Sequence, residues 1–174
     1  MSFSQRPHKF VTWFQKRTGG DVLWIDPYPS RLPRWGDWSR LVKSKPSRAA
    51  EQMDYPAWLT VIRPPALPLE PLRTLNWLNR GIWFPLLKQL RTFADNDTTL
   101  LAIGKPSALA LTVMHTLPQS RSLYDVMDNC PAFYTGLTQA TMRIYETQLI
   151  RQADTVWASS TPLQQQWQTL RPDI

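Results

Sequence analysis

Two carboxylates and an amide come at the end of an apolar run in the stretch SLYDVMDNCP. Asp125 and Asp128 are three residues apart, and Asn129 follows directly. Their oxygens accept hydrogen bonds from hydroxyl groups, so a strand ending here would present a polar tip to a hydroxyl-bearing ligand. Asp125 has a structural alternative, in which it caps the turn that follows the strand.

Small or polar residues also follow the other apolar runs of the sequence. These residues are Asp26, Arg63, Gly104, Lys105, Ser159 and Ser160. Ligands bind beyond the carboxyl ends of the strands in open parallel sheets, so these positions are candidates for one binding site. Ser159 and Ser160 have a structural alternative as caps of the last helix.

The elements that must position these residues alternate along the chain. Apolar runs predict strands at 21–27, 58–63, 98–104, 120–126 and 154–160, and helical patterns cover 9–18, 72–95, 105–118, 137–154 and 161–170. This alternation predicts an α/β fold that is Rossmann-like, with a mainly parallel sheet flanked by helices on both faces. Gly81 and Pro85 should break or kink the helix at 72–95, and 28–56 is expected to be a long loop.

The composition predicts one folded domain over 1–174. Hydrophobic residues make up 43% and charged residues 19%, which is typical of a globular protein. The single cysteine, Cys130, cannot form an internal disulfide, which fits a reducing cytoplasm. The N-terminus has no signal-peptide pattern, and no stretch of 18 apolar residues occurs.

Positive charge is concentrated in the N-terminal part of the chain. Residues 1–95 hold 15 Lys and Arg against 7 Asp and Glu, whereas residues 96–174 hold 5 against 6. This asymmetry suggests an anionic partner such as a phosphate, a nucleic acid or a membrane surface. The alternative is a basic face that only meets solvent.

The sequence lacks the motifs of several common cofactor-binding and catalytic sites. Neither a dinucleotide-binding glycine pattern nor a phosphate loop nor a nucleophile elbow occurs. No metal site is expected, since the two histidines and the one cysteine are not spaced as ligands. A Cys130 nucleophile with His8 or His115 as its base stays open beside a thiol without a role. A nucleic-acid partner is not expected, because no basic helix or aromatic RNA-binding strand is evident.

Four stretches appear in a characteristic order: SQRPHKFVTWF, DVLWIDPYPSRLP, SLYDVMDNCPAFYTG and YETQLIRQADTVWASSTPL. The third looks like a Tyr-Asp-x-x-Asp-Asp/Asn segment. The fourth carries a pattern made of Glu146, Ala153, Asp154, Val156, Ser159 and Ser160. Together they resemble the N-terminal domain of retaining glycosyltransferases of the GT-B fold, and the resemblance covers nearly the whole chain.

The resemblance implies the acceptor-binding half of an enzyme that transfers a sugar from a nucleotide-diphosphate sugar to a cell-surface glycan or a lipid-linked acceptor. The nucleotide sugar would be a co-substrate, with no tightly bound cofactor. Only six residues precede Pro7, too few for the family's first strand, and its C-terminal donor-binding domain does not follow. The chain alone is therefore expected to be inactive, with that domain supplied in cis or in trans. The expected location is the cytoplasm, with the inner face of the cell membrane as an option.

By the same resemblance, the substrate-binding candidates lie at the strand ends and before the first helix. Asp128 and Asn129 are expected in the cleft, and His8 is expected to meet a phosphate or the acceptor unless it only bonds the helix start. Glu146 is expected to pair with a nearby arginine. No catalytic residue is assigned.

The helix predicted at 72–95 mixes cations with large rings. The candidates for contact with a membrane surface are Arg73, Trp77, Arg80, Trp83, Lys88 and Arg91. Rings favour headgroup depth and cations favour anionic lipid, which would suit an enzyme with a lipid-linked acceptor. The alternative is a core-facing helix with a solvated basic side.

Two other functions fit the sequence. One is a non-catalytic binding or assembly subunit that keeps the half-fold and pairs with a separate donor-binding chain. The other is a basic α/β protein that binds RNA or a membrane, for which affinity would fall steeply with salt.

Overall fold

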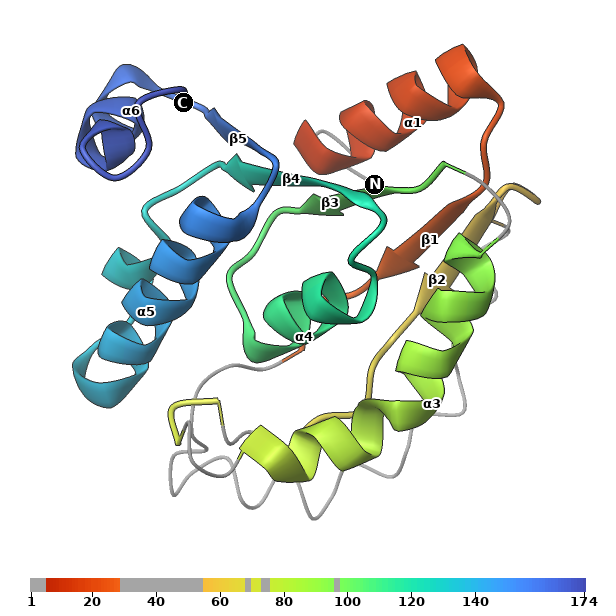
Figure 1. Ribbon diagram of the computed structural model, residues 1–174, viewed down its shortest axis with the longest axis horizontal. Helices are drawn as coiled ribbons and strands as arrows, with labels where there is room; N and C mark the ends of the chain where they lie inside the picture. Colours follow the sequence, from red (N-terminus) through yellow and green to blue (C-terminus); the bar gives the residue numbers. More distant parts are fainter. Residues whose placement is uncertain (1–5, 29–54, 68–69, 73–75, 96–97) are drawn as a thin grey trace. The chain divides into compact units, whose positions relative to one another are not determined.

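The computed structural model describes residues 6–28, 55–67, 70–72, 76–95 and 98–174 (Figure 1). The chain divides into two compact units. Within the described residues, the first comprises 6–28 and 55–64, and the second comprises those from 65 onward. The single domain expected over 1–174 stays a prediction. Most of the loop expected at 28–56 lies outside the described residues.

The first unit holds a helix and two parallel strands. These are α1 (Arg6–Thr18), β1 (Val22–Ile25) and β2 (Leu59–Ile62). The strands pair in register from Val22 with Leu59 to Ile25 with Ile62. Gly19 directly follows α1 and terminates it: its positive φ of 67° is one that glycine adopts without strain, and its N–H donates to the Gln15 carbonyl at 2.8 Å.

The second unit is built on a three-stranded parallel sheet. Its strands are β3 (Leu100–Ile103), β4 (Arg121–Val126) and β5 (Thr155–Ala158), in that order across the sheet. α4 (Ala108–Thr116) and α5 (Gly136–Gln152) connect the strands and contact each other, and right-handed connections place both on one face. α6 (Thr161–Gln168) follows β5.

The fold is therefore α/β with parallel strands, as predicted. The described strands form two small sheets instead of the one sheet predicted, because no ladder of hydrogen bonds joins β1 or β2 to the other three. The elements match the predicted ones in type and order. A short 3₁₀ helix, η3 (Cys130–Phe133), precedes α5 and was not predicted as a separate element.

α3 (Asn76–Ala94) runs through the two residues expected to break or kink it. Pro85 lacks an N–H, and its ring crowds the carbonyl four residues earlier, which belongs to Gly81. The helix accordingly changes direction along its length without ending (Figure 1). Of the two outcomes predicted, a break or a kink in the helix, the kink is therefore the correct one.

The buried side of α3 is bonded to the segment that precedes it. The Asn79 side chain accepts from the Leu67 N–H at 2.8 Å and donates to the Leu67 carbonyl at 3.0 Å. One turn later, the Trp83 indole N–H donates to the Pro65 carbonyl at 3.0 Å. Asn79 and Trp83 are both 0% exposed, so these bonds fix which face of α3 points outward.

Polar side chains also join the starts of β4 and β5. The Asp154 carboxylate accepts from the N–H and the hydroxyl of Ser122, both at 2.7 Å, and the Asp154 N–H donates to that hydroxyl at 2.9 Å. The Ser122 bonds lower the pKa of Asp154 below its ordinary value. These bonds hold the two strands together at their amino ends.

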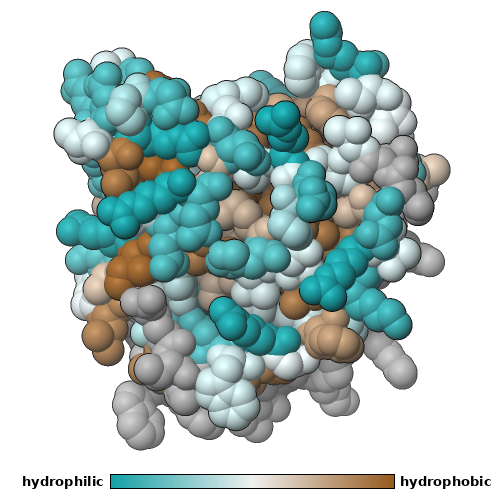
Figure 2. All heavy atoms as spheres, in the orientation of Figure 1, coloured by the Kyte–Doolittle hydropathy of each residue, from teal (hydrophilic) through white to brown (hydrophobic). Residues whose placement is uncertain are grey.

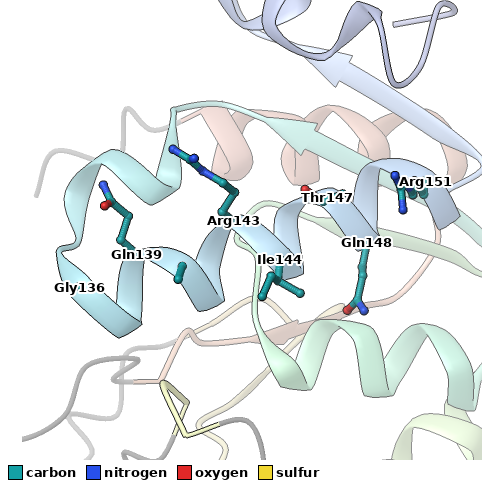
Figure 3. A pocket seen from close by; sticks show the side chains of 8 residues that line it. Gly136, Gln139, Arg143, Ile144, Thr147, Gln148 and Arg151 are labelled. Atoms are coloured by element: carbon teal, nitrogen blue, oxygen red, sulfur yellow. The ribbon is translucent and has the colours of Figure 1, made fainter.

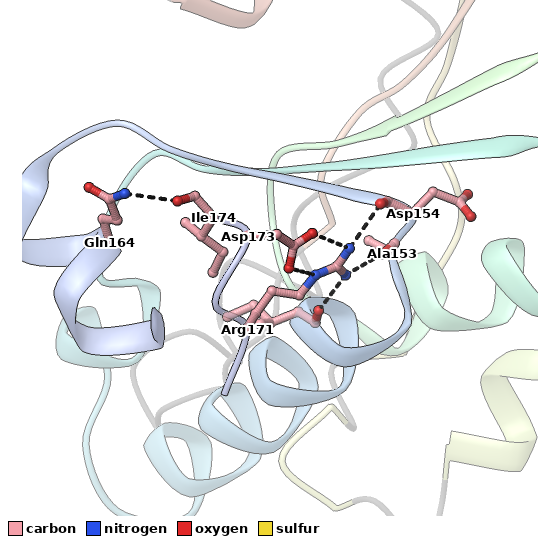
Figure 4. Close-up of polar contacts among 7 residues, drawn as sticks. Ala153, Asp154, Gln164, Arg171, Asp173 and Ile174 are labelled. Atoms are coloured by element: carbon pink, nitrogen blue, oxygen red, sulfur yellow. Dashed lines mark hydrogen bonds and ion pairs between the residues drawn. The ribbon is translucent and has the colours of Figure 1, made fainter. Parts of the chain in front are cut away.

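Arg171 closes the end of α5 (Figure 4). Its guanidinium donates to the carbonyls of Ile150 at 3.0 Å, of Ala153, and of Asp154 at 2.9 Å. The Asp173 carboxylate accepts from its Nε at 2.9 Å. A cation is favourable at a helix C-terminus, where carbonyls lack partners within the helix. The final residues of the chain therefore stabilise α5.

Candidate functional site

The carboxyl ends of β3, β4 and β5 meet at one edge of the sheet, which we call the carboxyl edge. The predicted residues there are Gly104, Lys105, Asp128, Asn129, Ser159 and Ser160. Ser159 donates from its N–H to the Val126 carbonyl at 3.0 Å and from its hydroxyl to the Met127 carbonyl at 2.7 Å. A side chain at Gly104 would begin 3.0 Å from Met127 Cε. The three strand ends are therefore in contact, as predicted.

Asp128 and Asn129 have exposed side chains at this edge. Their backbone carbonyls accept from the N–H groups of Cys130 and Ala132, both at 2.9 Å, and so form the turn into η3. Neither side chain makes a hydrogen bond within the described part of the chain. Both remain available to a ligand.

Asp125 lies one step back from the edge, inside β4. It is the register partner of Trp157 and shares its sheet face with Leu123, because side chains alternate along a strand. The turn after β4 is closed by the Asp125 carbonyl, which accepts from the Met127 N–H at 3.0 Å. Asp125 thus projects from a face of the sheet, whereas Asp128 lies on the turn beyond the strand.

The start of α4, which follows Gly104 and Lys105, is already occupied. The buried Glu70 carboxylate accepts from the Ala108 N–H at 2.6 Å, and the Ser107 hydroxyl accepts from the Ala110 N–H at 3.0 Å. An anion bound at a helix start uses these same N–H groups. A phosphate is therefore disfavoured at this helix, because Glu70 would have to leave first.

A buried polar pair lies behind the carboxyl edge. Glu146 on α5 is 0% exposed and accepts from the Tyr124 hydroxyl at 3.2 Å. Burial raises the pKa of Glu146 to about 7, and burial with the Glu146 charge raises that of Tyr124 well above its ordinary value. The predicted pairing with an arginine is corrected: Arg143 opposes the rise in pKa by its charge, but the hydrogen bond comes from Tyr124.

Cys130 is poorly suited to nucleophilic catalysis. Burial, with the charges of Glu146 and Asp128, raises the pKa of its thiol to about 11, and Lys105 opposes this rise. The thiolate is the reactive form of cysteine, and it is scarce at neutral pH when the pKa is this high. His115 is exposed in the last turn of α4. Cys130 therefore lacks the electrostatic environment that activates a thiol.

The remaining predicted residues belong to the first unit. The His8 ring stacks on Trp24 with 4.9 Å between the ring centroids. The Arg63 guanidinium donates to the Asp26 carboxylate at 3.1 Å, and the Trp24 indole donates to the same carboxylate at 2.8 Å. The ends of β1 and β2 therefore converge as predicted, in a unit separate from the carboxyl edge.

The last helix begins without a side-chain cap. Ser160 is the N-cap residue of α6, but its side chain makes no capping hydrogen bond. Ser159 bonds to the end of β4 instead. The expectation that these two serines cap the last helix through their side chains is therefore wrong: the Ser159 side chain bonds to Met127, and the Ser160 side chain is exposed.

A shallow hollow of about 580 Å³ follows the outer side of α5 (Figure 3). Its described lining comes from that helix alone and includes Gln139, Arg143, Thr147 and Arg151. Ligand sites enclose most of a ligand's surface, which one helix does not do. None of the predicted site residues lines this hollow.

The candidates for membrane contact separate into two faces. Trp77, Arg80, Lys88 and Arg91 are exposed on α3. Trp83 is fully buried, so it cannot contact a membrane surface. Arg73 lies outside the described residues.

Sequence reasoning missed the partners that depend on distant parts of the chain. Glu70 meets Ala108 across 38 residues, and Arg171 meets Ala153 across 18. Nothing next to either residue marks its role. A cap motif would be a local sequence signal, whereas these bonds arise only after the helices pack.

The described residues contain no cluster of three or more histidine, cysteine or acidic residues that could hold a metal ion. Nor does any described helix have the length and apolar character needed to cross a membrane. Comparisons with protein-family models, with curated proteins and with solved structures find no match to this chain.

Proposed function

We propose that this chain is the acceptor-side half of a glycosyltransferase of the GT-B fold. It would help to transfer a sugar from a nucleotide-diphosphate sugar to a cell-surface glycan or a lipid-linked acceptor. The observation that carries the proposal is the carboxyl edge, where Asp128 and Asn129 present exposed side chains, which make no hydrogen bond among the described residues, beyond three parallel strands. This is where ligands bind in open parallel sheets.

The available groups suit an acceptor better than a donor. Sugar transfer requires an acceptor hydroxyl held against the anomeric carbon, and positioning supplies much of the rate. Asp128 and Asn129 can accept hydrogen bonds from such hydroxyls. The leaving diphosphate needs cations or N–H donors, but Glu70 and Ser107 already use the N–H groups at the start of α4. The diphosphate of the donor would therefore be held elsewhere than at the start of α4.

The test is binding of sugars to the purified chain, measured by calorimetry with a panel of oligosaccharides and with nucleotide-diphosphate sugars. We expect an oligosaccharide to bind and the variant Asp128→Asn/Asn129→Ala to lose most of that binding. Both side chains are exposed and make no described hydrogen bond, so the variant should unfold at the same urea concentration as the wild type. Asp95→Asn, which removes another exposed carboxylate, is the matched control.

Three outcomes would contradict the proposal. Oligosaccharide binding that is unchanged in the variant would move the site away from the carboxyl edge. Binding of a nucleotide sugar alone would make this the donor side. Sugar transfer by the isolated chain would show that the chain holds a complete active site instead of half of one. Transfer only after a separate donor-binding chain is added would support the proposal.

A further inference from the structure

The outward face of α3 carries alternating rings and cations along one stripe. Trp77 and Phe84 are 65% and 66% exposed, and Arg80, Lys88 and Arg91 are exposed as well. Successive members are three or four residues apart, which is the spacing of neighbours on one side of a helix. We call these five residues the α3 stripe.

The rest of the helix fixes the α3 stripe in its outward position. Trp83, Leu86 and Leu90 are buried on the other side of α3. The bonds of Asn79 to Leu67 and of Trp83 to Pro65 prevent the helix from rotating about its axis. The exposed rings therefore cannot turn inward without breaking buried hydrogen bonds.

All the charged residues of α3 are positive. α3 reads NWLNRGIWFPLLKQLRTFA, which contains three cations and no acidic residue. Exposed rings leave apolar surface in water, and rings alternating with cations suit the boundary between lipid headgroups and acyl chains. In the face drawn in Figure 2, hydrophobic residues are interspersed among hydrophilic ones.

We propose that the α3 stripe docks on an anionic lipid bilayer. Trp77 and Phe84 enter at headgroup depth, while Arg80, Lys88 and Arg91 meet lipid phosphates. This inference rests on α3 alone and does not require the proposed sugar transfer. The charge attracts anionic lipid over a range set by the ionic strength, and the rings add a contribution that salt screens less.

The test is flotation of the full chain with vesicles of phosphatidylcholine, with or without phosphatidylglycerol. We expect binding only to the anionic vesicles. Because each basic residue near an anionic surface contributes substantially, Arg80→Gln/Lys88→Gln/Arg91→Gln should weaken binding about 100-fold. Trp77→Ser/Phe84→Ser should also weaken it. All five positions are exposed, so urea unfolding of both variants should match the wild type.

The matched control removes the same charge from α1 through Lys9→Gln/Lys16→Gln/Arg17→Gln. These cations are exposed and lie beside an exposed ring, Trp13, which Arg17 approaches at 5.9 Å. We expect this variant to bind as the wild type does. Equal losses in both cation variants would indicate a general charge effect. A loss with the cations but none with the rings would indicate a polyanion such as RNA. Either result, or no binding by the wild type, would overturn the proposal.

Discussion

Glu146→Gln is expected to stabilise the protein above pH 7 and to leave its stability near pH 4.5 almost unchanged. The Glu146 side chain is 0% exposed, and among the described residues only one of its oxygens has a hydrogen-bond partner, the Tyr124 hydroxyl at 3.2 Å. Burial raises its pKa from the ordinary 4.5 to about 7, against the smaller opposing effects of that hydrogen bond and of Arg143.

The sign of the pH dependence follows from which state holds the proton. Between pH 4.5 and about 7 the folded protein keeps the Glu146 proton, whereas the unfolded chain has released it. The stabilisation is therefore fully present below pH 4.5 and is lost as the pH rises through the folded pKa. A rise of this size in pKa corresponds to about 3 kcal/mol of unfolding free energy. Glutamine has nearly the shape of the protonated carboxyl group and does not ionise. The Glu146→Gln variant should therefore not lose unfolding free energy as the pH rises through the folded pKa of Glu146.

The assay is urea unfolding followed by tryptophan fluorescence, at a series of pH values for the wild type and the variant. The difference in unfolding free energy should grow as the pH rises and then level off. Asp128→Asn is the control, since it removes a carboxylate that is exposed. Parallel curves for the wild type and Glu146→Gln across the whole range would refute the reasoning, as would a variant that is less stable at every pH.

Three further predictions concern the bonds that hold the second unit together and its single thiol. Ser122→Ala should lower the unfolding free energy by about 1 kcal/mol in urea titrations. Since the Ser122 bonds lower the Asp154 pKa, their contribution is present above its ordinary value of 3.8 and should disappear as the pH falls through the lower folded value. Arg171→Gln should cost about 2 kcal/mol, because carbonyls at the end of α5 lose a charged donor, whereas Asp173→Asn should cost less. Cys130 should react with a thiol reagent about 100-fold more slowly in the folded than in the urea-unfolded protein, because burial raises its pKa from 9.0 to about 11; equal rates would contradict this.

Element type and order were predictable because the local patterns are strong. Short apolar runs ended by polar residues became β1 to β5, and Gly19 ended α1 where the sequence indicated. Parallel alternation also implied that strand ends would share an edge. Asp26 meets Arg63, and Ser159 meets Met127, as that geometry requires.

The packing partners were not predictable, because they join segments far apart in the sequence. Glu70 was given no role, yet it binds the start of α4. Trp83 is next to the exposed Phe84 and six residues after the exposed Trp77, but it is buried, and its indole N–H donates to the Pro65 carbonyl. Helical spacing separates the two faces of α3, but it does not say which face is buried.

Three residues of the fourth resembling stretch have structural roles that are sufficient to explain them. Glu146 bonds Tyr124, Asp154 holds the starts of β4 and β5, and Ser159 holds their ends. An α/β protein of another function would need these bonds as much as a glycosyltransferase would. That stretch therefore supports the fold more than the activity.

Asp128 and Asn129 are informative for the opposite reason. Their side chains are exposed and make no hydrogen bond within the described residues, so stability does not account for them. If they serve a ligand, Asp128→Asn/Asn129→Ala should change binding and leave unfolding alone, while Ser159→Ala should lower the unfolding free energy through the lost bond to Met127. If the effects were reversed, with Asp128 and Asn129 needed for folding, the case for a ligand at the carboxyl edge would be lost.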